Sequence, residues 1–154
     1  MEKAAFIDIK NNRCYYKNIN RIQYPISDTK KEEMNMKIAI GCDPNAEEAK
    51  QEIIAYIEKK GYGEVTDFGS EDPIYANVAV DVAEHVASGE YDRGVLICGT
   101  GLGVSIAANK VKGAYAALVS DVYSATRARL SNDANIVCMG AFTTGAKVRE
   151  MLVD

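Results

Sequence analysis

Residues 98–103, with the sequence CGTGLG, have the clearest chemical potential in this chain, because a cysteine and three glycines follow the apolar run RGVLI. A glycine-rich loop leaves backbone N–H groups free to approach an anion, above all where a helix begins directly after it. The helix dipole favours a nearby thiolate, and neighbouring amides can hold an oxyanion. The segment therefore predicts a thiolate base that removes a proton next to a carbonyl, with the resulting enediolate held by the loop.

Both parts of this segment also have a plainer interpretation. A tight turn between a strand and a helix needs glycine whether or not it binds a ligand, and a glycine spacing of this kind is a weak signal by itself. Most free cysteines are small buried apolar residues. Cys98 can act as a base only if the fold brings it to a pocket together with other polar groups.

The elements around this loop alternate between strands and helices. Apolar runs of strand length are followed by segments with helical periodicity, and glycines close several of the helices. Such an alternation with short connections predicts a three-layer αβα sandwich around a parallel, Rossmann-like sheet. The expected strands are residues 37–42, 63–69, 93–99, 114–120 and 134–140, and the expected helices are residues 45–61, 75–89, 102–113, 121–133 and 144–154.

In a sheet of this kind, ligands bind beyond the carboxyl ends of the strands. The strand at residues 93–99 is apolar almost throughout, as expected of a strand covered on both faces. Its carboxyl end carries the cysteine and the glycine loop. The other strand ends expected at the same edge of the sheet are Cys42-Asp43, Ser120-Asp121 and Gly140.

Composition excludes several classes of function. The chain has 154 residues, 47% of them hydrophobic, which is enough for one domain with a substantial core. A formal net charge of −4 predicts neither a nucleic-acid nor an anionic-membrane partner. No apolar run reaches the length of a membrane span, and no signal-peptide pattern is present. The four cysteines lack CxxC spacing, which indicates reduced thiols in a cytoplasmic protein rather than disulfides or a metal site.

Residues 1–35 do not join the alternation. They mix polar residues with tyrosines and show no sustained period, so we expect a poorly ordered N-terminal extension. The Lys-Lys-Glu-Glu segment before Met34 and Met36 must be encoded by purine-rich codons, which can spell a bacterial ribosome-binding sequence. An alternative hypothesis is therefore that the natural chain starts at Met36.

Three segments, IAIGCD, DRGVLICGTGLGVSIAANKVKG and SNDANIVCMG, together resemble the ribose-5-phosphate isomerase B family, which includes galactose-6-phosphate isomerase subunits. The resemblance runs continuously over residues 36–154. It implies a Rossmann-like aldose–ketose isomerase that acts on a sugar phosphate and needs no metal or cofactor. It also implies a homodimer or tetramer whose active sites are shared between subunits.

The resemblance implies roles for individual residues. Cys98 is expected to be the base that moves a proton between C1 and C2 of the sugar, with Thr100 beside it. Asp43 and Asn132 are expected to contact sugar hydroxyl groups. Tyr75 is a candidate hydroxyl donor, with packing at a helix start as the alternative. The glycines expected to bind the enediolate or the phosphate are Gly99, Gly101 and Gly103.

The chain departs from the family at several of these positions. Pro44 stands where the family has a histidine after its first strand, and Ser131 replaces the histidine that is credited with opening the sugar ring. Phe142 occupies the place of an arginine that binds phosphate, and Asp72 begins a segment that is Tyr-Pro in the family. Residues 36–154 also lack the family's C-terminal tail, whose arginines reach a neighbour's phosphate.

Some cations could compensate for the missing arginines. Arg129 is the best candidate for the substrate site, because the family often has arginine near this position. The competing interpretation for each of these cations is an exposed helix face. His85, the only histidine, lies within an expected helix and is predicted to be structural. The further candidate cations are Arg127, Lys147 and Arg149.

The departures bear on the substrate. An acid that opens a sugar ring is needed only for a substrate that cyclises, and a tetrose phosphorylated at O4 cannot close the usual furanose ring. Ser131 is therefore compatible with erythrose or erythrulose 4-phosphate as the substrate, and the segments YAN and LSND resemble the branch of the family that is associated with erythritol breakdown. Two alternatives stay open: a sugar-phosphate-binding protein without turnover, and a catalytically impaired subunit of a hetero-oligomer whose partner supplies the missing groups.

Overall fold

The computed structural model describes residues 5–8, 13–16, 36–69 and 71–154, which belong to two units, Met1–Glu32 and Glu33–Asp154. In the first unit, strands β1 (Ala5–Asp8) and β2 (Arg13–Tyr16) pair in antiparallel fashion. The sequence pattern predicts no strands there. The expectation of a poorly ordered extension otherwise concerns residues outside those that the structure describes.

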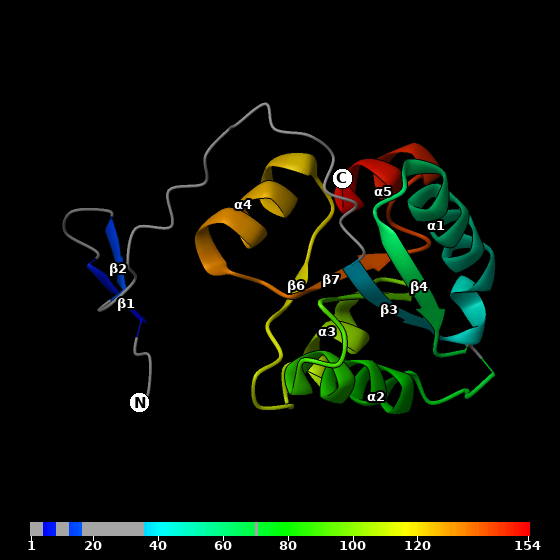
Figure 1. The fold of residues 1–154 in the computed structure, drawn as a ribbon, viewed down its shortest axis with the longest axis horizontal. Helices are drawn as coiled ribbons and strands as arrows, with labels where there is room; N and C mark the ends of the chain where they lie inside the picture. Colours follow the sequence, from blue (N-terminus) through cyan, green and yellow to red (C-terminus); the bar gives the residue numbers. More distant parts are fainter. Residues whose placement is uncertain (1–4, 9–12, 17–35, 70) are drawn as a thin grey trace. The chain divides into compact units, whose positions relative to one another are not determined.

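The second unit is built on a five-stranded sheet in which all strands are parallel, in the order β4-β3-β5-β7-β6 (Figure 1). This confirms the predicted α/β fold with a Rossmann-like sheet. The central strand β5 is buried at every residue but its first, as its continuous apolar run predicts. The strands are β3 (Met36–Cys42), β4 (Gly63–Asp67), β5 (Arg93–Cys98), β6 (Ala116–Leu118) and β7 (Ile136–Gly140).

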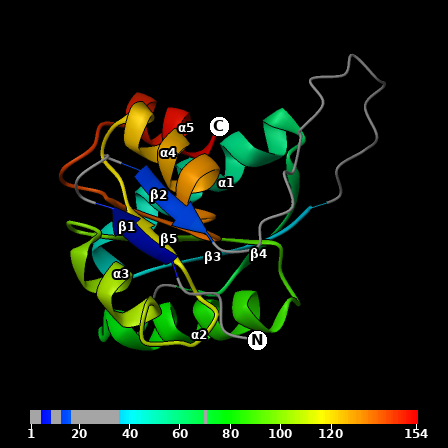
Figure 2. The ribbon, with the colours of Figure 1, turned by 90° about the vertical axis from the view of Figure 1, so that its left-hand side faces the viewer.

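Helices cover both faces of this sheet. Figures 1 and 2 show α2 and α3 on one face and α1, α4 and α5 on the other. The helix α4 packs most loosely, since none of its residues is buried. No helix in the described residues is long and apolar enough to cross a membrane. The helices are the short 3-10 turn η1 (Pro44–Ala46), α1 (Glu47–Lys60), α2 (Tyr75–Ser88), α3 (Leu102–Ala108), α4 (Val122–Asn132) and α5 (Ala146–Val153).

Two apolar clusters, one on each face of the sheet, hold the layers together. Side chains of β5 alternate between them, so Leu96 and Cys98 face α2 and α3 while Ile97 faces α1. Val82 of α2 and Ile53 of α1 are fully buried against these residues. Burial of each such side chain contributes about 1.5–3 kcal/mol, so the central strand is held firmly from both sides.

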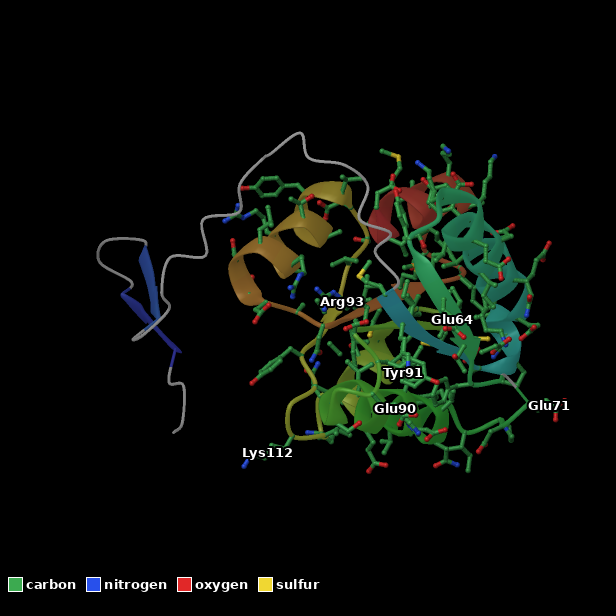
Figure 3. All side chains as sticks on the ribbon, viewed as in Figure 1. Glu64, Glu71, Glu90, Tyr91, Arg93 and Lys112 are labelled. Atoms are coloured by element: carbon green, nitrogen blue, oxygen red, sulfur yellow. The ribbon has the colours of Figure 1, made fainter. Side chains whose placement is uncertain are left out.

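The carboxyl ends of the three middle strands lie level with one another. Cys98 pairs with Gly140 of β7, and Ile97 pairs with Cys42 of β3. These ends therefore form one edge of the sheet, as the sequence analysis predicts. Arg93, the first residue of β5, lies at the opposite edge and is labelled in Figure 3.

The helix α3 is shorter than predicted, because it ends at Ala108 rather than near Gly113. The Asn109 side chain explains the early end. Its amide group donates to the carbonyls of Ser105 (2.8 Å) and Ala116 (2.7 Å) and accepts the N–H of Ala116 (3.0 Å). One side chain therefore closes the helix and ties it to the start of β6.

Candidate active site

Cys98 is the last residue of β5 and is only 5% exposed. Its Sγ atom accepts a hydrogen bond from the backbone N–H of Gly101, with a distance of 3.1 Å. An N–H donor interacts more favourably with a thiolate than with a neutral thiol. The loop thus turns back on the sulfur and presents the type of group that stabilises a charged base.

Gly101 is required by the shape of this turn. Its φ of 77° lies in the left-handed region, and a Cβ atom there would lie 2.5 Å from Leu118 Cδ1 and 2.7 Å from the carbonyl carbon of Met139. The plainer interpretation of the glycine therefore holds for Gly101, but it does not exclude a chemical role. The same turn that needs glycine is the one that aims an N–H at Cys98.

Tyr75 and Gly103 lie against each other. A Cβ atom at Gly103 would lie 2.6 Å from Cε2 of Tyr75, so the absence of a side chain lets the ring pack on the start of α3. Asp72 supports this arrangement, because its carboxylate accepts the Ile74 N–H (2.7 Å) and the side-chain amide of Asn77 (2.8 Å). The structure therefore brings Tyr75 to the glycine loop.

Asp43 lies at the same sheet edge as Cys98, directly after the adjacent strand β3. Its backbone N–H donates to the carbonyl of Ile97 (3.2 Å), and its carboxylate accepts the N–H of Asn45 (3.0 Å) and so caps η1. Asp43 is 8% exposed. A thiol and a buried carboxylate therefore meet at the carboxyl ends of neighbouring strands, where this class of fold binds ligands.

The loop after β7 forms the third wall of this edge. The N–H of Ala141 donates to the carbonyl of Cys98 (2.8 Å), and the N–H of Phe142 donates to the carbonyl of Gly99 (3.0 Å). The Phe142 ring is 74% exposed, and a Cβ atom at Gly99 would lie 3.1 Å from its Cδ2. An apolar ring thus stands beside the reactive loop where the related proteins are expected to have a cation.

Thr100 is exposed in the same loop. Its Oγ1 atom accepts the N–H of Leu102 at 3.3 Å, and the backbone of Thr100 touches the end of β7 at Gly140. The hydroxyl proton of Thr100 remains available to a ligand, since the hydroxyl is the acceptor in this bond.

Three predicted site residues lie elsewhere. Arg129, Ser131 and Asn132 belong to the last turns of α4, which leads into the start of β7. They are separated from the edge that carries Cys98 by the length of β7, about 13 Å at 3.3 Å per residue. Arg129 is engaged with Asp133 (2.6 Å). A single chain therefore does not bring these residues to the thiol.

Cys98 lines neither of two cavities of the second unit, which lie on other parts of the sheet. The larger, of about 440 Å³, lies between the sheet, α4 and α5 and includes Arg93 and Arg129 in a largely apolar wall. The other, of about 430 Å³, lies at the carboxyl end of β4 and includes Cys42 and Asp72.

The other buried cysteines have surroundings that keep them neutral. Burial raises the pKa of Cys42 to about 12, with a smaller opposite effect from the nearby Lys50 ammonium. Burial also raises the pKa of Cys138, which is fully buried in the core of the sheet. Cys138 is therefore a packing residue, and so mainly is Cys42, which also borders the smaller cavity. The side chain of Cys14 is outside the described residues.

Lys50 is a structural feature that the sequence analysis missed. It is 1% exposed, and its ammonium pairs with Asp67 at the end of β4 (2.8 Å) and with Glu47 (2.9 Å). Burial acts to lower the pKa of Lys50, but these hydrogen bonds outweigh burial and raise it. A signal was present, because Lys50 shares the helical face of Ile53 and Ile57.

His85 and Lys147 match the structural interpretations given to them. His85 contacts the rings of Phe68 and Tyr91 (centroids 5.0 and 6.0 Å away), and a hydrogen bond with the Asp81 carbonyl raises its pKa. Lys147 is exposed on α5. Among the described residues, no group of three His, Cys, Asp or Glu side chains could hold a metal ion.

Arg149 corrects the sequence analysis. It was a candidate for phosphate binding or for an exposed helix face, but it is 7% exposed and bonded to protein groups. Its guanidinium donates to the carbonyls of Ala141 and Thr144 and to the carboxylate of Glu52. Arg149 is therefore joined to the loop that follows β7, and this loop is in turn hydrogen-bonded to Cys98 and Gly99.

The part of the chain that carries this sheet edge matches a family model. Residues 38–154 match the model described as Ribose/Galactose Isomerase, so the chain belongs to this family and is an isomerase. This confirms the resemblance on which the expected roles rest.

Individual relatives support the same assignment. The chain is 50% identical over 122 residues to Ribose-5-P isomerase B of Listeria innocua, covering 77% of this chain and 82% of that protein. It is 42% identical to D-erythrulose-4-phosphate isomerase of Pectobacterium atrosepticum, with coverage of 77% and 80%. The solved structure of Clostridium thermocellum Ribose-5-Phosphate Isomerase B is 46% identical, with a TM-score of 0.73 and coverage of 77% and 82%.

Proposed function

We propose that this chain interconverts an aldose and a ketose that carry a phosphate group, with Cys98 as the base. The observation that carries this proposal is the Cys98 sulfur, which receives the Gly101 N–H at 3.1 Å at the edge that also holds buried Asp43. A general base and preorganised donors are the two requirements of enediolate chemistry. Cys98 ends β5, and the glycine loop that directly follows it is the proposed source of the donors.

The proposed reaction moves two protons. The Cys98 thiolate takes the proton from C2 of the aldose, and the negative charge moves to O1 of the resulting enediolate. The thiol then returns this proton to C1, which gives the ketose. A second proton passes from O2 to O1, and Thr100 is the hydroxyl that the loop itself offers for this transfer. Asp43 accepts a hydrogen bond from a sugar hydroxyl.

The complete site is proposed to need two chains. Asn132 and Ser131 lie at the opposite sheet edge from Cys98 in one chain, yet the family resemblance assigns all three to the substrate. A homodimer resolves this separation if the α4 end of one copy faces the glycine loop of the other. Such an arrangement would also shield a ligand beside Cys98 from water.

The substrate is proposed to be a tetrose phosphate. Ser131 and Pro44 replace histidines that handle the sugar ring, and a tetrose 4-phosphate has no furanose ring to open. The relative from Pectobacterium is a D-erythrulose-4-phosphate isomerase. Ribose 5-phosphate is the second candidate, favoured by the 50% identity to the Listeria protein.

The test is a panel of four-, five- and six-carbon sugar phosphates with purified protein in deuterated water, followed by proton NMR. We expect deuterium at C1 or C2 together with the isomeric product, fastest for erythrulose 4-phosphate. The Cys98→Ala variant should incorporate none above background. Binding of a sugar phosphate without deuterium incorporation would instead identify a binding protein, and faster turnover of ribose 5-phosphate would overturn the tetrose assignment.

A further inference from the structure

The helix α5 carries a buried arginine that reaches back over the end of β7. Arg149 donates from Nη1 to the carbonyls of Ala141 (3.3 Å) and Thr144, and from Nη2 to Glu52 of α1. Its side chain is 8% exposed, whereas that of Glu52 is 41% exposed. One guanidinium therefore joins α1, α5 and the Ala141–Thr144 loop.

That loop is bonded directly to the reactive segment. Two consecutive N–H groups, of Ala141 and Phe142, donate to the carbonyls of Cys98 (2.8 Å) and Gly99 (3.0 Å). At the loop's base, a Cβ atom on Gly140 would lie 2.7 Å from the carbonyl carbon of Thr100, so the two backbones are in close contact. A shift of the Ala141–Thr144 loop must therefore move the two peptides that directly follow the base.

We propose that Arg149, oriented by Glu52, is a positioning residue for the Cys98 base. This inference rests on the proposed function. The planar guanidinium offers donors in a fixed fork, and its charge strengthens each hydrogen bond to a carbonyl. The guanidinium binds the carbonyl of Ala141, and the N–H of Ala141 binds the carbonyl of Cys98. The sulfur and the loop amides are thereby fixed relative to each other.

The geometry separates this role from phosphate binding. Both terminal nitrogens of Arg149 are engaged with protein oxygens, and its Nε is buried without a hydrogen-bond partner among the described residues. A guanidinium held in this way cannot turn toward a ligand without breaking its bonds to the loop. Arg149 therefore acts through the Ala141–Thr144 loop rather than on the substrate.

The test compares Arg149→Met, Arg149→Lys and Glu52→Gln with the control Lys147→Met, which changes an exposed cation of the same helix. In Arg149→Met we expect kcat to fall about 10- to 100-fold while KM changes less than about threefold, because misplaced catalytic groups slow chemistry more than binding. Arg149→Lys should recover part of kcat, since an ammonium can still donate to both carbonyls. The kcat of Glu52→Gln should lie between those of the wild type and Arg149→Met. The kcat of Lys147→Met should equal that of the wild type.

Folding is monitored by circular dichroism, and rates are expressed per folded molecule. A wild-type kcat in folded Arg149→Met would overturn the inference. If Arg149→Met does not fold, the positioning role is tested with Arg149→Lys and Glu52→Gln. A wild-type kcat in both of these variants would also overturn the inference. Cys98→Ala separates the two levels of proposal: an active Cys98→Ala protein defeats the proposed function, whereas an inactive one beside a fully active Arg149→Met protein defeats only the positioning role.

Discussion

The sheet contains three buried cysteines, and their side chains have different surroundings. Cys98 meets a backbone N–H at 3.1 Å, whereas Cys138 is enclosed by apolar side chains. Cys42 lies 3.7 Å from the carboxylate of Glu47, a neighbour that disfavours a second negative charge. Of these three sulfurs, Cys98 has the surroundings that best suit the proposed base, because an N–H group rather than a carboxylate points at it.

Replacement of Cys98 by alanine should lower kcat about 10²- to 10⁴-fold, the usual contribution of a general base. The matched control is Cys138→Ala, which removes a sulfur from the same cluster and should keep kcat while lowering the free energy of unfolding by about 1 kcal/mol. Steady-state kinetics and urea unfolding measure the two effects. Full activity in Cys98→Ala would show that Cys98 only packs and that the base lies elsewhere, with Asp43 the first alternative.

Alkylation should also distinguish these thiols. At pH 8, a pKa of about 12 leaves about one Cys42 in 10⁴ as thiolate, and only the thiolate reacts. Iodoacetamide should therefore modify Cys98 well before Cys42 or Cys138, as counted by peptide mass spectrometry of the folded protein. As the pH rises toward 12, modification of Cys42 should increase. Equal labelling of all three at pH 8 would contradict the assigned environments.

At the scale of elements, the turn between β5 and α3 is the most constrained connection. It turns through Gly101 in the left-handed region, lets Tyr75 pack on Gly103, and receives two hydrogen bonds from the loop after β7. Strand, turn and neighbouring loop therefore form one rigid unit around the sulfur. This rigidity suits a site that must hold donors in place for a developing charge.

Gly101→Ala tests the turn. The added Cβ atom meets Leu118 at 2.5 Å and backbone of Met139 at 2.7 Å in addition to adopting an unfavourable φ, so we expect a loss of more than about 2 kcal/mol in unfolding free energy and a large loss of kcat. The control is Gly61→Ala, with a similar φ of 66° and no atom within 4 Å, which should cost about 1 kcal/mol and leave kcat unchanged. Chemical denaturation gives both values. If both substitutions lowered the free energy of unfolding equally, the atoms around Gly101 would have to move aside for the added Cβ atom at little cost.

At the scale of the whole molecule, the site residues fall on two edges of the sheet. Cys98 and Asp43 follow the carboxyl ends of strands, and Asn132 precedes the amino end of β7. The proposed homodimer joins these edges. In a single chain, α4 has no buried residue and borders a largely apolar cavity.

Mixing of inactive variants tests the shared site. Cys98→Ala and Asn132→Ala should each be inactive alone, because each damages every site of a homodimer. After mixing and subunit exchange, half of the molecules should be mixed dimers with one intact site, giving about a quarter of wild-type activity if exchange is random. Activity would be followed with the best substrate of the sugar panel. No recovery despite exchange demonstrated by mass spectrometry would contradict the shared site.

Ser131→His tests the substrate assignment. If ring opening limits the rate, the added histidine should raise kcat/KM for ribose 5-phosphate about tenfold or more, since a positioned acid typically contributes at least this much. Turnover of erythrulose 4-phosphate should change little, because its ring cannot form. The comparison of the two substrates within one variant corrects for any change in folded fraction. A parallel change in both would show that Ser131 has no specific part in ring opening.

The sequence by itself determined the alternation of elements and the strand ends that carry Cys98 and Asp43. Both follow from local patterns, since apolar runs, helical periodicity and glycine stops are written in consecutive residues. The edge shared by Cys98 and Asp43 was predictable as well, because parallel strands place all carboxyl ends together. The segments IAIGCD, DRGVLICGTGLGVSIAANKVKG and SNDANIVCMG together indicated the family that residues 38–154 match.

Only the tertiary structure decided what lies around those ends. The burial of Arg149 depends on Glu52, which lies 97 residues away in the sequence. The helical face of Lys50 is readable from the sequence, but its partner Asp67, 17 residues away, is not. The sequence of a helix does not tell which of its long charged side chains will be buried against a carboxylate. That choice depends on packing, which is a property of the folded chain.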